Sequence, residues 1–93
     1  MKSNYTYQIK THDGRSCIVI QDKDAGGKTV TNNMEDVIDE ICHKENINPA
    51  DYIIIYQDSM GLYDGWNYTK ADFVILQVTN WETAVEVYLR QQV

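Results

Sequence analysis

The sequence predicts a single small α+β domain in which two helices pack on a four-stranded, mainly antiparallel sheet, with the elements in the order ββαββα. Its 93 residues leave room for one hydrophobic core, so we treat residues 1–93 as one domain. Hydrophobic residues make up 43% of the chain, which is too many for a disordered one. Short β-rich runs alternate with segments of helical apolar spacing, and this alternation predicts the mixed class.

The first two strands are predicted to form a hairpin. Apolar and polar residues alternate over residues 5–10, which is the period of a half-buried strand. Asp13-Gly14 tolerates the positive φ of a tight turn, and residues 17–20 supply a second β-rich run. The polar, glycine-rich segment 22–28 should then leave the sheet as an exposed loop.

The first helix is predicted from an apolar stripe in the middle of the chain. Asn32 is a suitable N-cap, with Glu35 placed to complete a capping box, and Thr31 is the competing cap. Pro49 can open a short turn after the helix, because proline at a first helical position loses no hydrogen bond. The stripe follows the spacing i, i+3, i+4, i+7 and i+8 and consists of Met34, Val37, Ile38, Ile41 and Cys42.

The remaining elements complete the predicted sheet and add the second helix. Residues 52–56 are apolar on both alternating faces, which indicates a strand at the centre of the sheet. Residues 58–66 are interpreted as a connecting loop, and residues 73–78 as the last strand. Thr79 and Glu82 form a second predicted capping box. It opens a helix whose apolar stripe is Trp81, Ala84, Val85, Tyr88 and Leu89.

The charge of the chain bears on its partners. Eight Lys and Arg against fourteen Asp and Glu give a net charge of −6, and the cations are scattered. Direct nucleic-acid binding depends on clustered cations, so we expect none and favour a cationic protein partner instead. The apolar runs are far too short to span a bilayer, and the N-terminus lacks an apolar signal core, so we expect no membrane association and a cytoplasmic location.

No catalytic, cofactor-binding or metal-binding motif is complete, so we expect no catalytic residue, no cofactor and no metal. Cys17 and Cys42 fall in segments that read as core, where a thiol is expected to be reduced and structural. His12 and His43 are placed poorly to activate either thiol, and the spacings do not fit a zinc site. Whether the protein is an enzyme stays open at this point, with the balance toward a non-enzymatic role.

Two groups of residues are candidate interaction surfaces. The first is a carboxylate face on the first helix, which is either an ordinary solvated face or a surface that docks a basic protein or imitates a row of phosphates: Glu35, Asp36, Asp39 and Glu40. The second is the segment 58–66, whose large apolar residues either cap the core or form an interface: Asp58, Met60, Leu62, Tyr63, Asp64 and Trp66.

Two motifs resemble a group of short uncharacterised bacterial proteins. They are Thr-Val-Thr-Asn-Asn-Met-Glu at 29–35 and Tyr-Gln-Asp-Ser-Met-Gly-Leu-Tyr-Asp-Gly at 56–65. In that group a Thr-Asn helix start precedes a strand that ends in Asp-Ser-x-Gly-x-aromatic-Asp. The resemblance implies a small accessory protein of a chromosome, phage or mobile gene cassette, and it carries no established activity.

These observations lead to one functional hypothesis and two alternatives. The hypothesis is a small non-enzymatic protein-binding or regulatory module, which could form a homodimer through an exposed sheet edge or its helix faces. The first alternative is an anti-defence protein that imitates nucleic acid and inhibits a host enzyme. The second is a small ligand-binding protein or enzyme, which would need a pocket lined by Tyr56, Asp58, Tyr63 or Trp66.

Overall fold

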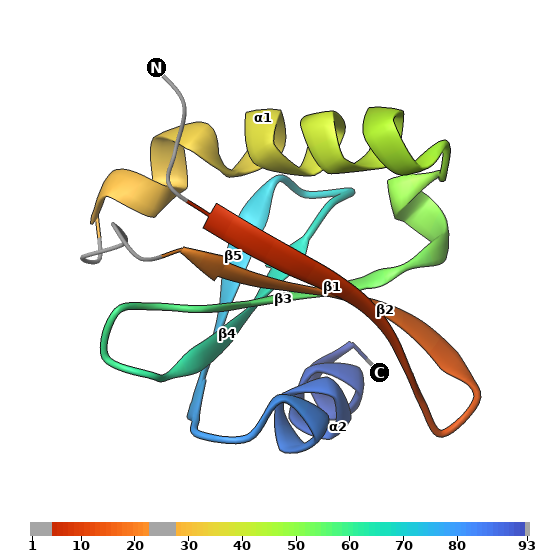
Figure 1. The fold of residues 1–93 in the computed structure, drawn as a ribbon. Helices are drawn as coiled ribbons and strands as arrows, with labels where there is room; N and C mark the ends of the chain where they lie inside the picture. The colour runs from red at the N-terminus through yellow and green to blue at the C-terminus, as the bar shows by residue number, and fades with distance from the viewer. Residues whose placement is uncertain (1–4, 23–27, 93) are drawn as a thin grey trace.

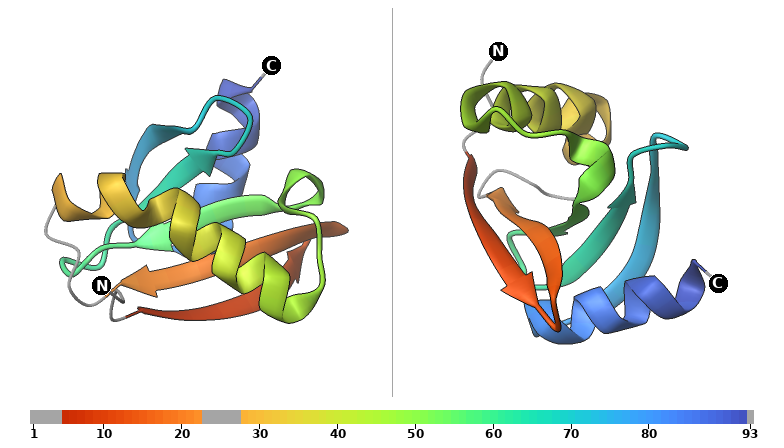
Figure 2. Two further views of the ribbon diagram at one scale, coloured as in Figure 1. Left: turned by 90° about the horizontal axis from the view of Figure 1, so that it is seen from above. Right: turned by 90° about the vertical axis from the view of Figure 1, so that its right-hand side faces the viewer.

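A five-stranded mixed sheet forms the middle layer of the protein, and one helix covers each of its faces (Figure 1). The computed structural model describes residues 5–22 and 28–92. The right-hand view of Figure 2 shows the layers most clearly, with α1 above the sheet and α2 below it. The helices are α1 (Lys28–Glu45) and α2 (Trp81–Gln91), and a short 3-10 turn, η1, spans Pro49–Asp51. The strands are β1 (Tyr5–His12), β2 (Arg15–Asp22), β3 (Ile53–Gln57), β4 (Tyr63–Asn67) and β5 (Asp72–Val78).

The strands lie across the sheet in chain order, which leaves β1 and β5 at the two edges. β2 and β3 are parallel, and α1 lies between them in the chain, as a parallel pair requires a crossover. The other three neighbouring pairs are antiparallel. The predicted central position of residues 52–56 is confirmed, because β3 lies in the middle of the sheet.

The predicted β1–β2 hairpin is also confirmed. Its turn consists of Asp13 at φ 53° and Gly14 at φ 77°, so both turn residues have the positive φ of a type I′ turn. His12 and Arg15 form the pair that closes the turn, and the register runs without a shift from there to the pair of Tyr5 and Asp22.

Each face of the sheet has its own hydrophobic core, because successive side chains of a strand point to opposite faces. Ile18 and Ile20 of β2 pack in the core under α1, whereas Cys17 and Val19 pack in the core on the α2 side. The predicted stripe of α1 is confirmed in full, because all five of its residues are buried. The predicted stripe of α2 is confirmed in part, because only its Ala84 and Val85 are fully buried.

The prediction of four strands is wrong, because residues 63–67 form β4 and not a loop. The chain therefore has the element order ββαβββα once the short 3-10 turn is left aside. The strand reads Tyr-Asp-Gly-Trp-Asn, and Asp, Gly and Asn are all depleted in strands, so its local sequence hides it. Its four residues from Tyr63 to Trp66 are nevertheless buried.

The predicted start of the first helix is also wrong. α1 begins at Lys28, so Thr31 and Asn32 lie within it and neither is its N-cap. Of the predicted loop 22–28, Asp22 belongs to β2 and Lys28 to α1, and residues 23–27 lie outside the described residues. The cap of α2 is Asn80 and not Thr79. The Asn80 side-chain oxygen accepts hydrogen bonds from the backbone N–H groups of Glu82 at 2.9 Å and Thr83 at 3.0 Å.

Neither helix of the described chain has an apolar stretch of the length needed to cross a membrane.

Candidate functional site

The four predicted carboxylates of α1 lie together on its exposed face. Glu35, Asp36, Asp39 and Glu40 are all exposed, whereas the apolar stripe of the same helix is buried against the sheet. Among the side chains that the structure describes, no Lys or Arg forms an ion pair with any of them. We call this surface the α1 acidic face.

Tyrosine hydroxyls from β1 and from the β4–β5 turn contact carboxylates of α1. At the β1 edge, the Tyr5 hydroxyl donates to Glu40 Oε1 at 2.7 Å, and the Tyr7 hydroxyl donates to Glu45 Oε2 at 2.6 Å. The remaining contact comes from the turn between β4 and β5, where the Tyr68 hydroxyl lies 3.4 Å from Asp39 Oδ1. β1 and the β4–β5 turn flank α1 on opposite sides (Figure 2), so the phenols of Tyr5 and Tyr68 border the acidic face from both.

These tyrosines remain protonated hydrogen-bond donors well into the alkaline range. Burial, together with the hydrogen bond to Glu40, raises the pKa of Tyr5. The hydrogen bond to Glu45 raises the pKa of Tyr7, and the negative charge of Asp39 raises the pKa of Tyr68. The acidic face ends at Glu40, before the last turn of α1, which contains His43 and Lys44.

The first half of the second candidate segment is a turn that Asp58 organises. Its Oδ1 accepts hydrogen bonds from the backbone N–H groups of Met60 at 2.8 Å and Leu62 at 3.0 Å. The backbone N–H of Asp58 donates to the Leu62 carbonyl at 3.0 Å, which closes the turn. Asp58 thus has a structural role in the β3–β4 connection.

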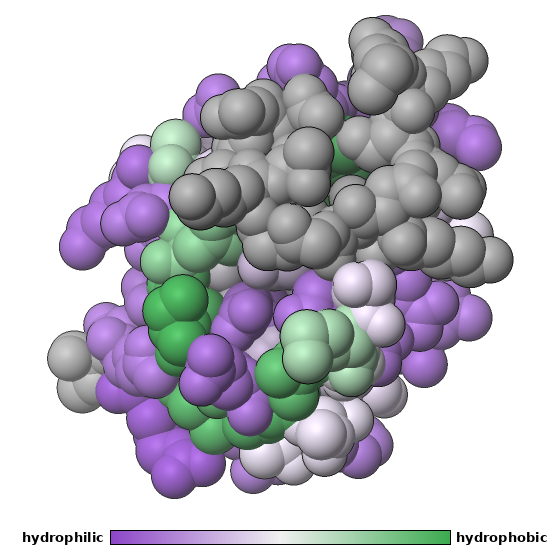
Figure 3. Space-filling model, turned by 90° about the vertical axis from the view of Figure 1, so that its left-hand side faces the viewer, coloured by the Kyte–Doolittle hydropathy of each residue, from purple (hydrophilic) through white to green (hydrophobic). Residues whose placement is uncertain are grey.

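The apolar side chains of this turn differ in exposure. Met60 is 82% exposed, and Leu62 is half-buried. On the edge strand β5, Ile75 is 65% exposed. Figure 3, which views the molecule from the left of Figure 1, shows a curved band of hydrophobic residues on this side. Met60 is therefore the residue of the predicted 58–66 surface that the structure leaves most accessible.

The second half of the segment is part of the sheet. Tyr63, Asp64 and Trp66 are buried in β4. Asp64 lies where the pairing of β4 with β5 shifts register, and its Oδ1 accepts hydrogen bonds from the backbone N–H groups of Leu76 at 2.8 Å and Gln77 at 3.1 Å. A carboxylate at this position satisfies main-chain donors that the irregular ladder leaves without a strand partner.

Tyr56 and Trp66 are core residues of the α1 side of the sheet. The Trp66 ring meets Phe73 edge to face with centroids 4.9 Å apart, and Tyr56 lies 5.1 Å from the same phenylalanine. The Tyr56 hydroxyl lies 3.4 Å from Asp64 Oδ2, and burial raises its pKa. The aromatic residues of the 56–66 region therefore pack inward and do not form a single exposed surface with Met60.

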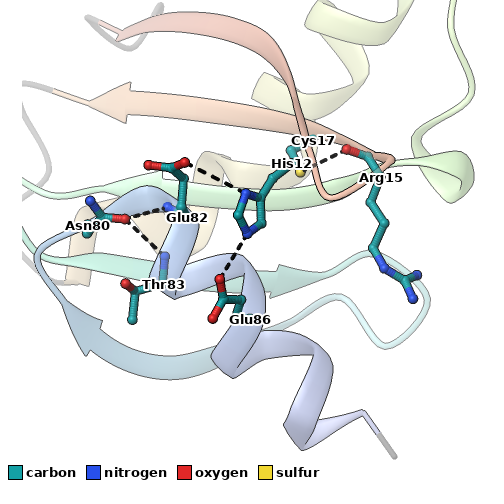
Figure 4. Close-up of polar contacts among 7 residues, drawn as sticks. All are labelled: His12, Arg15, Cys17, Asn80, Glu82, Thr83 and Glu86. Atoms are coloured by element: carbon teal, nitrogen blue, oxygen red, sulfur yellow. Dashed lines mark hydrogen bonds and ion pairs between the residues drawn. The ribbon is translucent and has the colours of Figure 1, made fainter.

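His12 joins the hairpin to α2, a contact that the sequence did not reveal (Figure 4). Its Nε2 lies 3.0 Å from Glu86 Oε2, and its Nδ1 lies 3.7 Å from Glu82 Oε2. The ring also meets Trp81 edge to face at 5.8 Å. The two carboxylates are one turn apart on α2, so they hold the imidazole between them.

The cysteines have the character of core residues. Cys17 is fully buried, and its thiol donates to the Arg15 carbonyl at 3.6 Å. Burial raises the pKa values of both Cys17 and Cys42, which favours the unreactive thiol over the nucleophilic thiolate. Within the described residues, no group of three or more His, Cys, Asp or Glu side chains is arranged to hold a metal ion.

Two of the surface pockets lined by described residues are well defined. One of about 200 Å³ lies on the α2 side of β1 and β2 and reaches Tyr63 and Trp81. The other, of about 310 Å³, lies between the β4–β5 turn and the end of α2. Neither is lined by Tyr56, Asp58 or Trp66, which were three of the four residues expected around a ligand pocket.

Comparison of the chain with family models gave no match, and comparisons with curated proteins and with solved structures gave none either. The resemblance to short bacterial accessory proteins stays a prediction.

Proposed function

We propose that the protein is a non-enzymatic binding module that docks a cationic protein partner on the α1 acidic face. The observation that carries the proposal is the set of four exposed carboxylates without an ion-pair partner among the described side chains. Two like-charged pairs on this face, Glu35 with Asp39 and Asp36 with Glu40, have the spacing i, i+4. Like charges at this spacing destabilise an isolated helix by roughly 0.2–0.5 kcal/mol per pair. Lys or Arg side chains of a partner, placed beside these carboxylates, would replace this repulsion with attraction.

The tyrosines beside the acidic face support the same proposal. Tyr5 and Tyr7 are half-buried at the β1 edge, and Tyr68 is 36% exposed near Asp39. Tyrosine is enriched in interfaces because it offers a large contact area and a hydrogen-bonding group with few rotatable bonds. A cationic partner would meet carboxylates flanked by aromatic rings, which also attract cations.

The alternative of a nucleic-acid mimic has less support from the charge arrangement. Glu82 and Glu86 are on α2, on the opposite side of the sheet, where they contact His12. The row on α1 is short and is followed by His43 and Lys44. An extended row of charges with the spacing of a nucleic-acid backbone would need more carboxylates on one face.

The proposal can be tested by capturing partners of the tagged protein from a lysate of its native host. One variant neutralises the acidic face with near-isosteric amides: Glu35→Gln, Asp36→Asn, Asp39→Asn and Glu40→Gln. A matched control makes the same change in net charge at other exposed positions: Asp13→Asn, Asp51→Asn, Asp72→Asn and Glu86→Gln.

We expect a salt-sensitive basic partner that the wild type and the control retain and the acidic-face variant loses. Equal loss from both variants would mean that net charge acts without a defined surface. Retention by the acidic-face variant would contradict the proposal. A captured nucleic-acid enzyme that added DNA or RNA displaces would favour the mimic instead.

The exposed Met60 in the β3–β4 turn offers a second contact surface. Loss of partner capture on Met60→Ser would assign a binding role to it.

We place the protein in the cytoplasm, where its free cysteines, Cys17 and Cys42, would stay reduced. A concentration-independent monomer in sedimentation would rule out the homodimer.

A further inference from the structure

The outer edge of β1 has the features of a strand that accepts another chain. β1 is at the end of the sheet, and in the described part of the chain only β2 pairs with it. Its eight residues pair with β2 without a register shift, and they include no proline. Natural proteins commonly protect exposed edges with bulges, prolines or several charges, because an unprotected edge is a template for pairing.

The register shows which main-chain groups face outward. A two-residue type I′ turn closes on a hydrogen-bonded pair, which here is His12 with Arg15. Bonded and non-bonded pairs alternate along an antiparallel ladder. The main-chain N–H and C=O groups of the odd-numbered residues therefore point away from β2, and these residues are Tyr5, Tyr7, Ile9 and Thr11.

Side chains of the same residues lie on the α1 side of the sheet. Tyr5 and Tyr7 contact Glu40 and Glu45 there, and Ile9 is 41% exposed beside them. An added strand would direct every second side chain to the α1 side, and those beside Tyr5 and Tyr7 would lie next to these two carboxylates.

The last turn of α1 also brings one cation close to Glu40 and Glu45, at the corner between α1 and the β1 edge. Lys44 Nζ lies 5.9 Å from the centre of the Tyr7 ring. Glu40 and Glu45 outnumber it, so the corner has a net negative charge and attracts a cationic side chain.

The opposite face of the edge has different chemistry. The pocket of about 200 Å³ opens there beneath β1, and its lining includes Gln8, Lys10, Gln21 and Trp81. Lys10 Nζ lies 5.0 Å from the centre of the Trp81 ring, so this face already holds a cation. Side chains of an added strand that point to this face would best be uncharged.

We propose that the β1 edge binds an extended segment of the cationic partner as a sixth strand. Its Lys or Arg side chains would face Glu40 and Glu45, and its intervening uncharged side chains would face the pocket. This mode is strand addition, in which main-chain hydrogen bonds provide affinity and alternate side chains provide specificity. The inference rests on the proposed function and names the way in which the partner binds.

A second copy of the chain fits this edge less well. Pairing of two β1 strands about a two-fold axis perpendicular to the sheet would bring both α1 helices to the same side of the joined sheet. Glu40 and Glu45 of each copy would then border one junction, and each copy has a net charge of −6. A cationic segment avoids this repulsion.

The test uses the full chain and two synthetic nine-residue peptides. One alternates lysine and threonine, and the control has the same composition with all lysines followed by all threonines. Amide hydrogen exchange is measured by NMR with and without each peptide. We expect the alternating peptide to slow exchange of the outward amides of Tyr7, Ile9 and Thr11 by roughly tenfold or more. The amides of Gln8 and Lys10, already bonded to β2, should change little.

Variants test the edge and the charges separately. Ile9→Pro removes one outward N–H and should abolish binding, whereas Ile9→Ala keeps that N–H and should bind. If Ile9→Pro does not fold, peptides methylated on alternate backbone nitrogens replace it, and only one of the two methylation patterns should prevent binding. Glu40→Gln and Glu45→Gln, which retain an acceptor for the tyrosines, should each weaken binding roughly two- to fivefold.

The outcomes separate this inference from the function on which it rests. Binding of both peptides with unchanged exchange at the edge would overturn strand addition and leave the acidic-face proposal standing. Failure of both peptides to bind at low salt would contradict both proposals. Edge protection that appears without peptide and rises with protein concentration would show that a second copy occupies the edge, and would overturn the choice of partner.

Discussion

Replacing Asp64 tests the most specific structural role that the fold assigns to a carboxylate. Asp64→Ala removes the acceptor of two backbone N–H groups, those of Leu76 and Gln77, at 2.8 and 3.1 Å. Hydrogen bonds to charged groups contribute roughly 1.5–3 kcal/mol each. Gln77 is exposed, so water can replace part of the loss, and we expect a decrease in unfolding free energy of about 3 kcal/mol.

Urea denaturation followed by tryptophan fluorescence measures this loss, and an unchanged slope would show that the two-state comparison holds. Asp64→Asn keeps an oxygen acceptor and should lose only about 1–2 kcal/mol, since its bonds become neutral. Tyr56→Phe removes only the 3.4 Å contact and should cost less than either. A loss below about 1 kcal/mol for Asp64→Ala would refute the assignment, because the irregular ladder would then be stable without the carboxylate.

Three further predictions concern the core. Gly65→Ala would place a Cβ 2.6 Å from Cδ1 of Tyr88 and should destabilise the fold by about 1–3 kcal/mol in the same urea assay. The same change should cost less when it is made in a Tyr88→Ala background, and an equal cost in both backgrounds would argue against the contact. Burial raises the pKa of Tyr56 above the usual tyrosine value of about 10. The stability that the protonated Tyr56 contributes is therefore complete below about pH 10 and is lost as the pH rises through the raised pKa. Tyr56→Phe should therefore flatten the alkaline part of a stability-versus-pH curve, and an unchanged curve would exclude this tyrosine as the cause. Cys17 and Cys42 should react with a thiol reagent at least roughly 100-fold more slowly in the native protein than in urea, and fast native labelling of either would contradict its burial.

The elements that the sequence predicted well are those whose burial follows a local period. The helical stripe from Met34 to Cys42 repeats at 3.6 residues, and all of it is buried. The apolar run of β3 is apolar on both faces because a helix lies on each side of the sheet. In both cases the information is contained within one short segment.

The elements that the sequence did not predict depend on distant contacts. β4 is built from residues with low strand propensity, and Asp64 fits there because it bonds to amides 12 and 13 residues away. The start of α1 was misplaced because Asn32 resembles a cap while lying inside the helix. Local propensity was overridden by tertiary structure at both places.

The candidate site divides in the same way. Helical spacing alone placed the four carboxylates of α1 on one face. The contacts of Tyr5 with Glu40 and Tyr7 with Glu45 span 35 and 38 residues, so no local pattern could predict them. The 58–66 segment was interpreted as one surface, but its turn is exposed at Met60 while Trp66 belongs to the core.

An NMR titration of the full chain with the alternating lysine–threonine peptide would show directly whether α1 carries the binding surface. We expect saturable shifts at the backbone amides of the α1 acidic face, largest at Glu40 and at the neighbouring Glu45 beside the β1 edge, that weaken as salt is added, because exposed charges are screened. We expect little change at Glu82 and Glu86, whose carboxylates contact His12 on the other side of the sheet. Shifts centred on α2, or no saturable shifts at low salt, would contradict the claim that α1 carries the binding surface.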